Sequence, residues 1–369
     1  MISGIISRPK GGAEIKMIYF LSDYSGGAHP KVLDAIVKTN AENSDGYGND
    51  VHSENAANMI RRMVGSDSCA VHFMTGGTSC NVTFIASCLR PYESVIAPRT
   101  GHAYFHETGA VESTGHRVTA VDGINGKLTP LLIDKALAEH QDEHTPLPGL
   151  VYISQPTELG SVYTKAELCA LRNKCLESGL LLYIDGARLG CALTSGGCDL
   201  TINDIAALCD AFYIGGTKNG ALFGEALVIM NEALDDHFRY MIKQKCGLFA
   251  KGRLIGVQFE ALLDKGDESL YFSCAKKANE RARQLIAGLS RLGIEFEGAS
   301  LTNQIFPILP ANVVKELKKD FAFYEWAPEK DGMVTVRLVT SYNTTKKGRG
   351  RAFARRKAFF EKLREKKGL

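Results

Sequence analysis

The sequence predicts an α/β protein, with a large domain built on a mainly parallel, doubly wound sheet and a small α+β domain after it. Through residues 17–265, apolar runs of strand length alternate with segments of helical period. From residue 266 onward, a long charged helix is followed by short strands. The chain has 369 residues, enough for two domains, so we expect a flexible leader at 1–16, a large domain at 17–265 and a small domain at 266–369.

Six apolar runs in the large domain have the length of strands. They cover residues 69–74, 94–97, 149–153, 180–184, 211–214 and 226–230. Two of the helices between them have clear start signals, a capping box at Thr164 and Glu167 and a Thr129-Pro130 pair. Because parallel strands need crossover connections, this order predicts a mainly parallel sheet with helices on both faces.

The small domain is expected to hold a helix at 268–292, a strand at 304–309, a short helix from Ala311 and a strand at 333–340. A terminal helix follows, in which residues 346–369 carry eleven basic and two acidic residues. One interpretation of this tail is a solvated helix whose Phe353, Phe360 and Leu363 dock on the body of the protein. The alternative is a contact with RNA or another polyanion.

The composition excludes several classes of protein. Lysine plus arginine number 44 and aspartate plus glutamate 41, so the net charge of +3 gives no broad basic field for nucleic acid. No apolar run approaches the roughly 18 residues that cross a bilayer. The ten cysteines form no C-x-x-C pair, which is typical of reduced thiols and predicts a cytoplasmic location. We therefore expect a small-molecule substrate.

Two chemically active residues follow predicted parallel strands, at the sheet edge where doubly wound proteins bind ligands. Asp185 follows the run 180–184, and an aspartate there is costly to bury without a cationic partner. Lys218 lies in Gly-Gly-Thr-Lys-Asn-Gly after the run 211–214. Glycines permit close backbone approach, and a lysine in such a place can have a lowered pKa and act as a nucleophilic amine.

Two earlier segments add an anion site and an imidazole. Gly77 and Thr78 lie in Thr-Gly-Gly-Thr-Ser at an expected helix start, where free backbone N–H groups can bind a phosphate. His102 follows the strand that ends at Ala97. Each feature alone also fits a turn or a structural histidine. Their order along the chain, which is anion site, imidazole, acid and lysine, indicates one common site.

Five motifs resemble those of a known family. They are TGGT, GHAYFHETGA, YIDGARLG, GGTKNG and RLVTSY, and the resemblance covers residues 17–342. They are similar to fold-type I pyridoxal-phosphate enzymes, specifically the group of L-threonine aldolases and β-eliminating lyases. The resemblance implies a PLP-dependent transferase-like fold and pyridoxal 5′-phosphate as the cofactor. No metal ligand is assigned.

The resemblance implies roles for the matched residues around the cofactor. Lys218 would form the Schiff base with the cofactor aldehyde, Asp185 would pair with the pyridinium nitrogen, and His102 would stack on the ring. Gly77 and Thr78 would hold the phosphate. The cofactor stabilises the charge left when a bond at Cα breaks, provided that the ring nitrogen stays protonated, and Asp185 would keep it so.

The resemblance also implies a substrate site. Arg337 in RLVTSY would bind the substrate carboxylate as a bidentate fork, Ser22 would complete that pocket, and Arg188 would lie near the cofactor or the same carboxylate. Because Arg337 would orient the substrate, it would select which bond breaks. His102 would be the first candidate for the base that accepts the β-hydroxyl proton, directly or through a water.

The sequence departs from the family at one position of this site. Many threonine aldolases have a histidine in the loop after the strand 149–153, where this chain has Glu158. We therefore expect Glu158 to contact the substrate, and both the identity of the base and the preference for threo or erythro substrates stay open.

The family resemblance extends to an interface between subunits. Residues 45–50 resemble the family's loop near the dimer interface, and Lys251 or Arg253 would reach the phosphate of a neighbouring subunit. The resemblance implies a homo-oligomer, a dimer of dimers whose active sites lie at the dimer interface.

The function expected from these residues is that of a carbon–carbon lyase, a pyridoxal-phosphate-dependent aldolase that cleaves L-threonine or L-allo-threonine to glycine and an aldehyde. The alternative is a β-eliminating lyase or an aminotransferase that uses the same cofactor on another amino acid. A non-catalytic interaction protein that keeps the fold is a third reading, against which the intact Lys218 and Asp185 argue.

Overall fold

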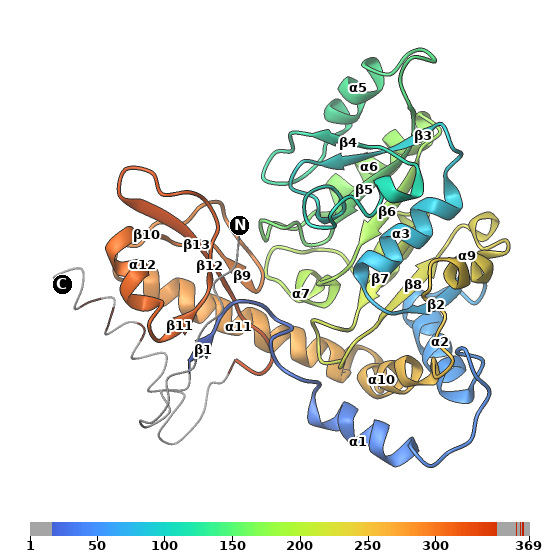
Figure 1. Cartoon of the computed structure of the whole chain (residues 1–369), viewed down its shortest axis with the longest axis horizontal. Coiled ribbons are helices and arrows are strands. Elements are labelled where there is room, and N and C mark those ends of the chain that lie inside the picture. The colour runs from blue at the N-terminus through green and yellow to red at the C-terminus, as the bar shows by residue number, and fades with distance from the viewer. Residues whose placement is uncertain (1–16, 345–358, 360–361, 363, 365–369) are drawn as a thin grey trace.

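The computed structural model describes residues 17–344 together with residues 359, 362 and 364 (Figure 1). Its main sheet has seven strands. In spatial order they are β2 (Ala70–Met74), β8 (Glu225–Ile229), β7 (Ala211–Gly215), β6 (Leu181–Asp185), β5 (Leu147–Ser154), β3 (Glu93–Pro98) and β4 (Val118–Val121). The strands from β7 to β4 pair in parallel, which confirms the expected mainly parallel sheet.

Strands β8 and β4 differ from the simple repeating pattern. β8 runs antiparallel to both of its neighbours, β7 and β2. The connection from β7 to β8, residues 216–224, is too short for the helical crossover that a parallel pair needs. β4 is an edge strand of which only two residues are buried, and the apolar runs of the sequence did not predict it.

Helices cover both faces of the main sheet, as expected. The α-helices of this part are α1 (Pro30–Thr39), α2 (Val51–Val64), α3 (Gly77–Cys88), α4 (His102–Phe105), α5 (Pro130–Ala138), α6 (Lys165–Glu177), α7 (Leu189–Leu193), α8 (Ile202–Ala207), α9 (Phe238–Gln244) and α10 (Arg253–Leu263). The predicted capping box at Thr164 and Glu167 begins α6, and Thr129 caps α5.

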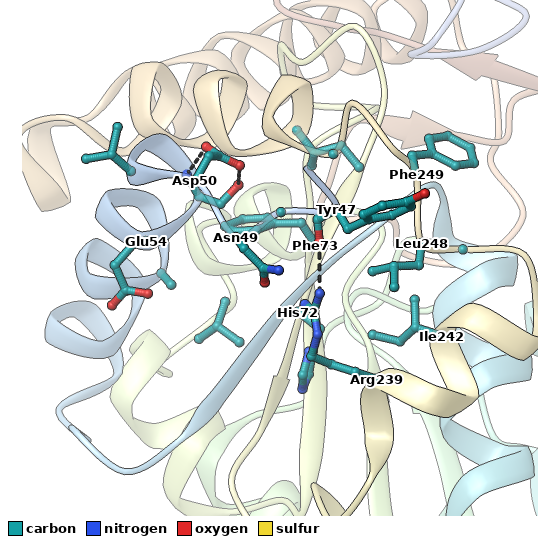
Figure 2. A pocket seen from close by; sticks show the side chains of 18 of the residues that line it. Tyr47, Asn49, Asp50, Glu54, His72, Phe73, Arg239, Ile242, Leu248 and Phe249 are labelled. Atoms are coloured by element: carbon teal, nitrogen blue, oxygen red, sulfur yellow. Dashed lines mark hydrogen bonds between the residues drawn. The ribbon is translucent and has the colours of Figure 1, made fainter. Parts of the chain in front are cut away.

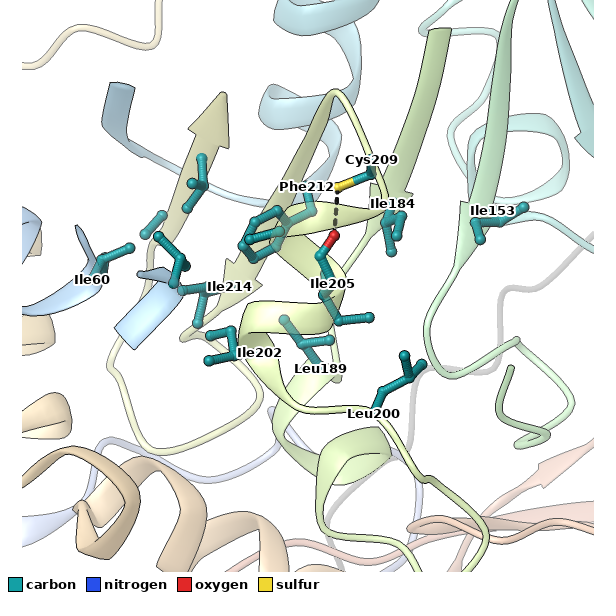
Figure 3. Close-up of a cluster of buried hydrophobic side chains, with 14 of the residues drawn as sticks. Ile60, Ile153, Ile184, Leu189, Leu200, Ile202, Ile205, Cys209, Phe212 and Ile214 are labelled. Carbon is teal, nitrogen blue, oxygen red and sulfur yellow. Dashed lines mark hydrogen bonds between the residues drawn. The ribbon is translucent and has the colours of Figure 1, made fainter. Parts of the chain in front are cut away.

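Alternate residues of each strand enter two separate cores. On one face, Ile153, Ile184 and Phe212 pack among residues of α2, α6, α8 and α10 (Figure 3). On the other face, tyrosines at neighbouring positions of the same strands, including Tyr152 and Tyr213, pack among residues of α3, α4 and α9. A side chain on the second face therefore points toward the N-terminal ends of α3 and α4, where the sequence predicts a ligand site.

The C-terminal part has its own antiparallel sheet and core. Its helices are α11 (Leu270–Ser290) and α12 (Ala311–Leu317), and its strands are β9 (Gln304–Ile305), β10 (Ile308–Pro310), β12 (Tyr324–Glu325) and β13 (Met333–Val339). The single strand predicted at 304–309 is thus two short strands. β1 (Ile18–Tyr19) pairs in parallel with β11 (Phe321–Ala322), so the first described strand packs with this C-terminal part (Figure 1).

The described residues of the terminal segment contact the same core. Phe359 is fully buried, and its ring lies 5.0 Å from that of Phe321 and 6.1 Å from that of Phe20. Lys362 forms an ion pair with Asp320. The leader at 1–16 and the predicted docking residues Phe353, Phe360 and Leu363 lie outside the described residues. Contact of the tail with a polyanion stays a prediction.

Two further observations bear on the expected class of protein. No helix within the described part of the chain has the length and apolar character needed to cross a membrane. None of the ten cysteines forms a disulfide, and Cys246 alone among them is exposed.

Candidate active site

Asp185 ends β6 as a buried carboxylate that accepts hydrogen bonds from several donors. The Tyr213 hydroxyl donates to Oδ1 at 2.5 Å, and the Ala187 backbone N–H donates to the same oxygen at 3.0 Å. The Tyr152 hydroxyl donates to Oδ2 at 2.5 Å, and the Asn81 amide donates to it at 3.3 Å. These donors come from β5, β7, α3 and the loop after β6, so the fold fixes the position of the carboxylate.

The charge state of Asp185 follows from this environment. Burial acts to raise its pKa, but nearby His102, the two tyrosine hydroxyls and Lys218 together lower the pKa below its ordinary value. The sequence predicted that a buried Asp185 needs a cationic partner. The structure instead places neutral hydroxyls in contact with it, and its positive neighbours act from a distance.

Lys218 follows β7 in the loop that leads to β8. Burial, and next the positive Arg188, lower the pKa of its amine, which favours the uncharged, nucleophilic form. The loop beneath it is tight, since a Cβ on Gly216 would lie 2.6 Å from the Gly224 carbonyl oxygen. Buried Glu225 accepts the Gly216 N–H at 2.6 Å, and burial raises the pKa of Glu225 to about 7.

The predicted anion site lies at the start of α3. A Cβ on Gly77 would lie 2.6 Å from the Tyr213 hydroxyl oxygen, so this position needs glycine. The hydroxyl of Ser79 is buried and has no partner among the described residues, whereas that of Thr78 donates to Glu107 at 3.2 Å. An unpartnered buried hydroxyl beside free helix N–H groups fits an anionic ligand.

His102 begins α4 and is held by Glu107. Its Nδ1 lies 2.9 Å from Glu107 Oε1, which also accepts from Asn81 at 2.8 Å. The Glu107 side chain is fully buried, and its Oε2 has no partner in the described part of the chain. When the His102 ring is neutral, its contact with Glu107 assigns the proton to Nδ1 and leaves Nε2 as an acceptor. Glu107 was not among the predicted site residues, although it lies in the motif GHAYFHETGA.

Glu158 lies close to His102, in the loop after β5. Its Oε1 accepts from the Ser154 hydroxyl at 2.6 Å and from the His102 backbone N–H at 2.9 Å. Its Oε2 is buried without a partner within the described residues. Burial, and to a smaller extent the charge of Asp185, raise the pKa of Glu158. The raised pKa means that Glu158 exchanges its proton at a higher pH than an exposed glutamate does.

The two predicted arginines have different surroundings. Arg188 forms a bidentate ion pair with Asp23 at 2.6 and 3.0 Å, and Asn303 donates to the same carboxylate at 2.8 Å. The side chain of Arg337 on β13 has no hydrogen bond or ion pair with another described residue, and its Nε is buried. The Arg188 fork is thus already bound to a carboxylate, whereas the fork of Arg337 is available to a ligand.

Ser22 lies beside this ion pair without taking part in it. Its hydroxyl is 2.8 Å from that of Ser25. The neighbouring Asp23, which sequence reasoning missed, is the residue that reaches Arg188. The position of Asp23 next to the predicted Ser22 was the only sign in the sequence of its role.

Part of the loop predicted at a subunit interface, residues 47–50, lines a separate cavity of about 580 Å³, shown in Figure 2. Tyr47, Asp50 and Phe249 line it. The guanidinium of Arg253 is hydrogen-bonded within its own chain, since it donates to the carbonyls of residues 39 and 40 at 2.9 and 3.4 Å. Lys251 is exposed and has no ion pair with any residue that the structure describes.

Comparisons with known proteins agree with this fold. The family model described as β-eliminating lyase matches residues 20–311. A low specificity L-threonine aldolase of a Pseudomonas species is 33% identical, over 88% of this chain and 93% of that protein. A threonine aldolase of Leishmania major has a structure that matches with a TM-score of 0.90 at 44% identity, over 94% of this chain and 99% of that one.

A more distant structure matches in its fold alone. An aspartate aminotransferase of Thermus thermophilus gives a TM-score of 0.70 at 17% identity, over 95% of this chain and 91% of that one. The predicted fold class, an aminotransferase-like α/β large part with a smaller C-terminal part, is confirmed. The extent of the family match and the identity to the Pseudomonas enzyme show that this chain belongs to the β-eliminating lyase family.

Proposed function

We propose that this chain is a pyridoxal-phosphate-dependent aldolase that cleaves L-threonine or L-allo-threonine to glycine and acetaldehyde. The observation that carries the proposal is that Asp185, held by two hydroxyls at the end of β6, and Lys218, just after β7, follow neighbouring parallel strands at one edge of the sheet. The relatives named threonine aldolase support the choice of this reaction over the other reactions of the same cofactor.

The residues present fit pyridoxal phosphate. Lys218 would bind its aldehyde carbon, Asp185 its ring nitrogen, and His102 one face of its ring. Gly77 and Thr78 would hold its phosphate, and the unpartnered hydroxyl of Ser79 would add a donor to that cradle. When bound, the cofactor supplies an electron sink for the bond that breaks at Cα.

The protein would orient the substrate through one arginine. Arg337 has free donors, so we assign it the carboxylate of the amino acid. Arg188 is already neutralised by Asp23, and we assign it a supporting role beside the cofactor. Fixing the carboxylate places the Cα–Cβ bond where it can break, which is the positional choice that separates cleavage from elimination and transamination.

Cleavage of the Cα–Cβ bond also requires loss of the β-hydroxyl proton. His102 is the first candidate acceptor, since Glu107 assigns the proton to Nδ1 and leaves Nε2 free. Glu158 offers a second acceptor in its unpartnered Oε2. We propose that Glu158 contacts the substrate hydroxyl and that His102 accepts its proton, directly or through a water.

We further propose that the chain forms a homodimer and that two such dimers associate. In each dimer, Lys251 would reach the cofactor phosphate in the site of the neighbouring subunit. Exposed Tyr47, Val51 and Phe249 near the cavity of Figure 2 offer apolar surface to a second copy. Mixing a Lys218→Ala subunit with a Lys251→Ala subunit tests this arrangement. Each variant alone should be inactive or weak, and mixed dimers should regain activity if two chains build each site. A cytoplasmic location stays a prediction.

The experiment that tests the activity combines a spectrum with a product assay. The purified protein should show an absorbance band of the lysine-bound cofactor that borohydride removes while fixing the cofactor to Lys218. L-Threonine should then yield glycine and acetaldehyde, and Lys218→Ala should abolish both the band and the product. Pyruvate with ammonia, or a keto acid, would assign the chain to elimination or transamination instead.

A further inference from the structure

The guanidinium of Arg337 lies over two aromatic rings. Its central carbon is 5.3 Å from the centroid of Tyr324 and 5.1 Å from that of Trp326. Tyr324 is the direct cross-strand partner of Arg337 in the β12–β13 ladder. Trp326 stays beside β13 because its backbone N–H donates to the Thr335 carbonyl at 2.8 Å. Both contacts therefore arise from strand pairing and not from a flexible loop.

Trp326 is itself held from two sides. Its ring packs 5.2 Å from that of Phe306, which is buried, and 6.2 Å from that of His106 at the end of α4. A ring fixed in this way restricts the arginine that lies over it. Cation–π contacts are attractive by themselves and also reduce the rotamer freedom that a long side chain would lose on binding a ligand.

The donors of Arg337 remain open in this arrangement. Rings that contact the flat face of a guanidinium leave its N–H groups, which lie in the plane, free for a ligand. Nε is buried and has no partner among the described residues. A buried donor without an acceptor is unfavourable, and a carboxylate that binds the fork would satisfy it.

We propose that Tyr324 and Trp326 are positioning residues that hold the Arg337 guanidinium in the plane in which it receives the substrate carboxylate. The proposal rests on the function proposed above and extends it, because it makes substrate affinity depend on two rings that do not touch the reacting bond. It also gives a spectroscopic probe, because Trp326 is the single tryptophan of the chain.

The kinetic test compares ring removal with ring retention. Trp326→Leu and Tyr324→Leu should each raise KM for L-threonine about tenfold with a smaller change in kcat, as loss of a desolvated cation–π contact predicts. Trp326→Phe and Tyr324→Phe keep a ring and should stay within about threefold of the parent enzyme. Cofactor affinity should be unchanged in all four variants. Phenylalanine variants as weak as the leucine variants would overturn the proposal.

A second measurement needs no turnover. Sodium acetate, a carboxylate without an amino group, should change the tryptophan emission of the holoenzyme in a saturable way, whereas sodium chloride should not. Arg337→Gln should abolish the response to acetate. A parent enzyme whose emission is unchanged by acetate, while Arg337→Gln still raises KM, would overturn the ring proposal and leave the aldolase intact. A saturable acetate response in an enzyme that releases no acetaldehyde would support the ring proposal and refute the aldolase.

Discussion

Replacing Tyr213 with phenylalanine would remove one of the two hydroxyls that donate to Asp185 and would change little else. The Tyr213 Oη–Asp185 Oδ1 distance is 2.5 Å, and the two residues are 1% and 3% exposed. Water has little access to replace the lost donor, so Oδ1 would keep only the Ala187 N–H. A hydrogen bond to a charged group contributes about 1.5–3 kcal/mol, and its loss would raise the pKa of Asp185 toward the ordinary range.

The pH dependence of this effect has a definite sign. The pKa of Asp185 is lowered in the folded protein, so its contribution to stability is present above the unfolded-state pKa and is lost as pH falls through the folded-state pKa. Tyr213→Phe should therefore lower the free energy of unfolding by about 1.5–3 kcal/mol near neutral pH. The difference should shrink as the pH falls below the ordinary aspartate range toward the lowered folded-state pKa of Asp185.

Urea unfolding of the cofactor-free protein at several pH values measures this loss. Tyr183→Phe is the matched control, because it removes an equally buried hydroxyl that donates to the neutral Asn81 amide at 3.1 Å. That control should cost about 0.5–1.5 kcal/mol at every pH. In an Asp185→Asn background the effect of Tyr213→Phe should fall to the level of the control. A loss that is independent of pH, or unchanged by Asp185→Asn, would refute the reasoning.

Four further substitutions test other parts of the site and fold. Burial raises the pKa of Glu158, so the pH profile of kcat/KM should have an acidic limb above the ordinary glutamate range. Glu158→Gln should remove that limb, and an unchanged profile would assign the limb to another group. Asp23→Asn should lower the free energy of unfolding by about 3–5 kcal/mol because it leaves Arg188 buried and unpaired, and a loss below about 1 kcal/mol would contradict this. Phe359→Ala should lower the free energy of unfolding, measured by thermal unfolding, by about 3–5 kcal/mol, because Phe359 is buried against Phe321. An unchanged stability would show that this residue does not pack there. Gly77→Ala should weaken cofactor binding in an absorbance titration, because its Cβ would displace a hydroxyl 2.6 Å away, and unchanged affinity would exclude a tight cradle.

The strands that the sequence predicts in the main sheet are mostly buried on both faces, except β2, which lies at an edge with one buried residue of five. Their side chains are apolar at consecutive positions, so the six runs mark them without knowledge of their neighbours. β4 lies at an edge and is only partly buried, and β11 and β12 have two residues each, too few to show any periodicity. The direction of β8 depends on the length of its connection and not on the composition of the strand.

The site divides in a similar way between local and long-range features. Lys218, Asp185 and His102 lie in motifs that can be read from a few neighbouring residues. Asp23 acquires its role from Arg188, which is 165 positions away, and Tyr152 contacts Asp185 across 33 positions. Such partners meet only because neighbouring strands and the N-terminal segment are brought together, so no local pattern in the sequence could predict them.

The charges of the site explain why its two arginines are not interchangeable. Several ionic groups of the site have partners in the chain: Asp23 neutralises Arg188, Glu107 holds His102, and hydroxyls stabilise Asp185. Of the two arginines, Arg337 forms no ion pair with any residue that the structure describes, and burial lowers its pKa. A ligand carboxylate supplies the missing acceptor. Substrate affinity and the choice of the bond that breaks would then depend on the same side chain, so a loosened Arg337 should impair both together.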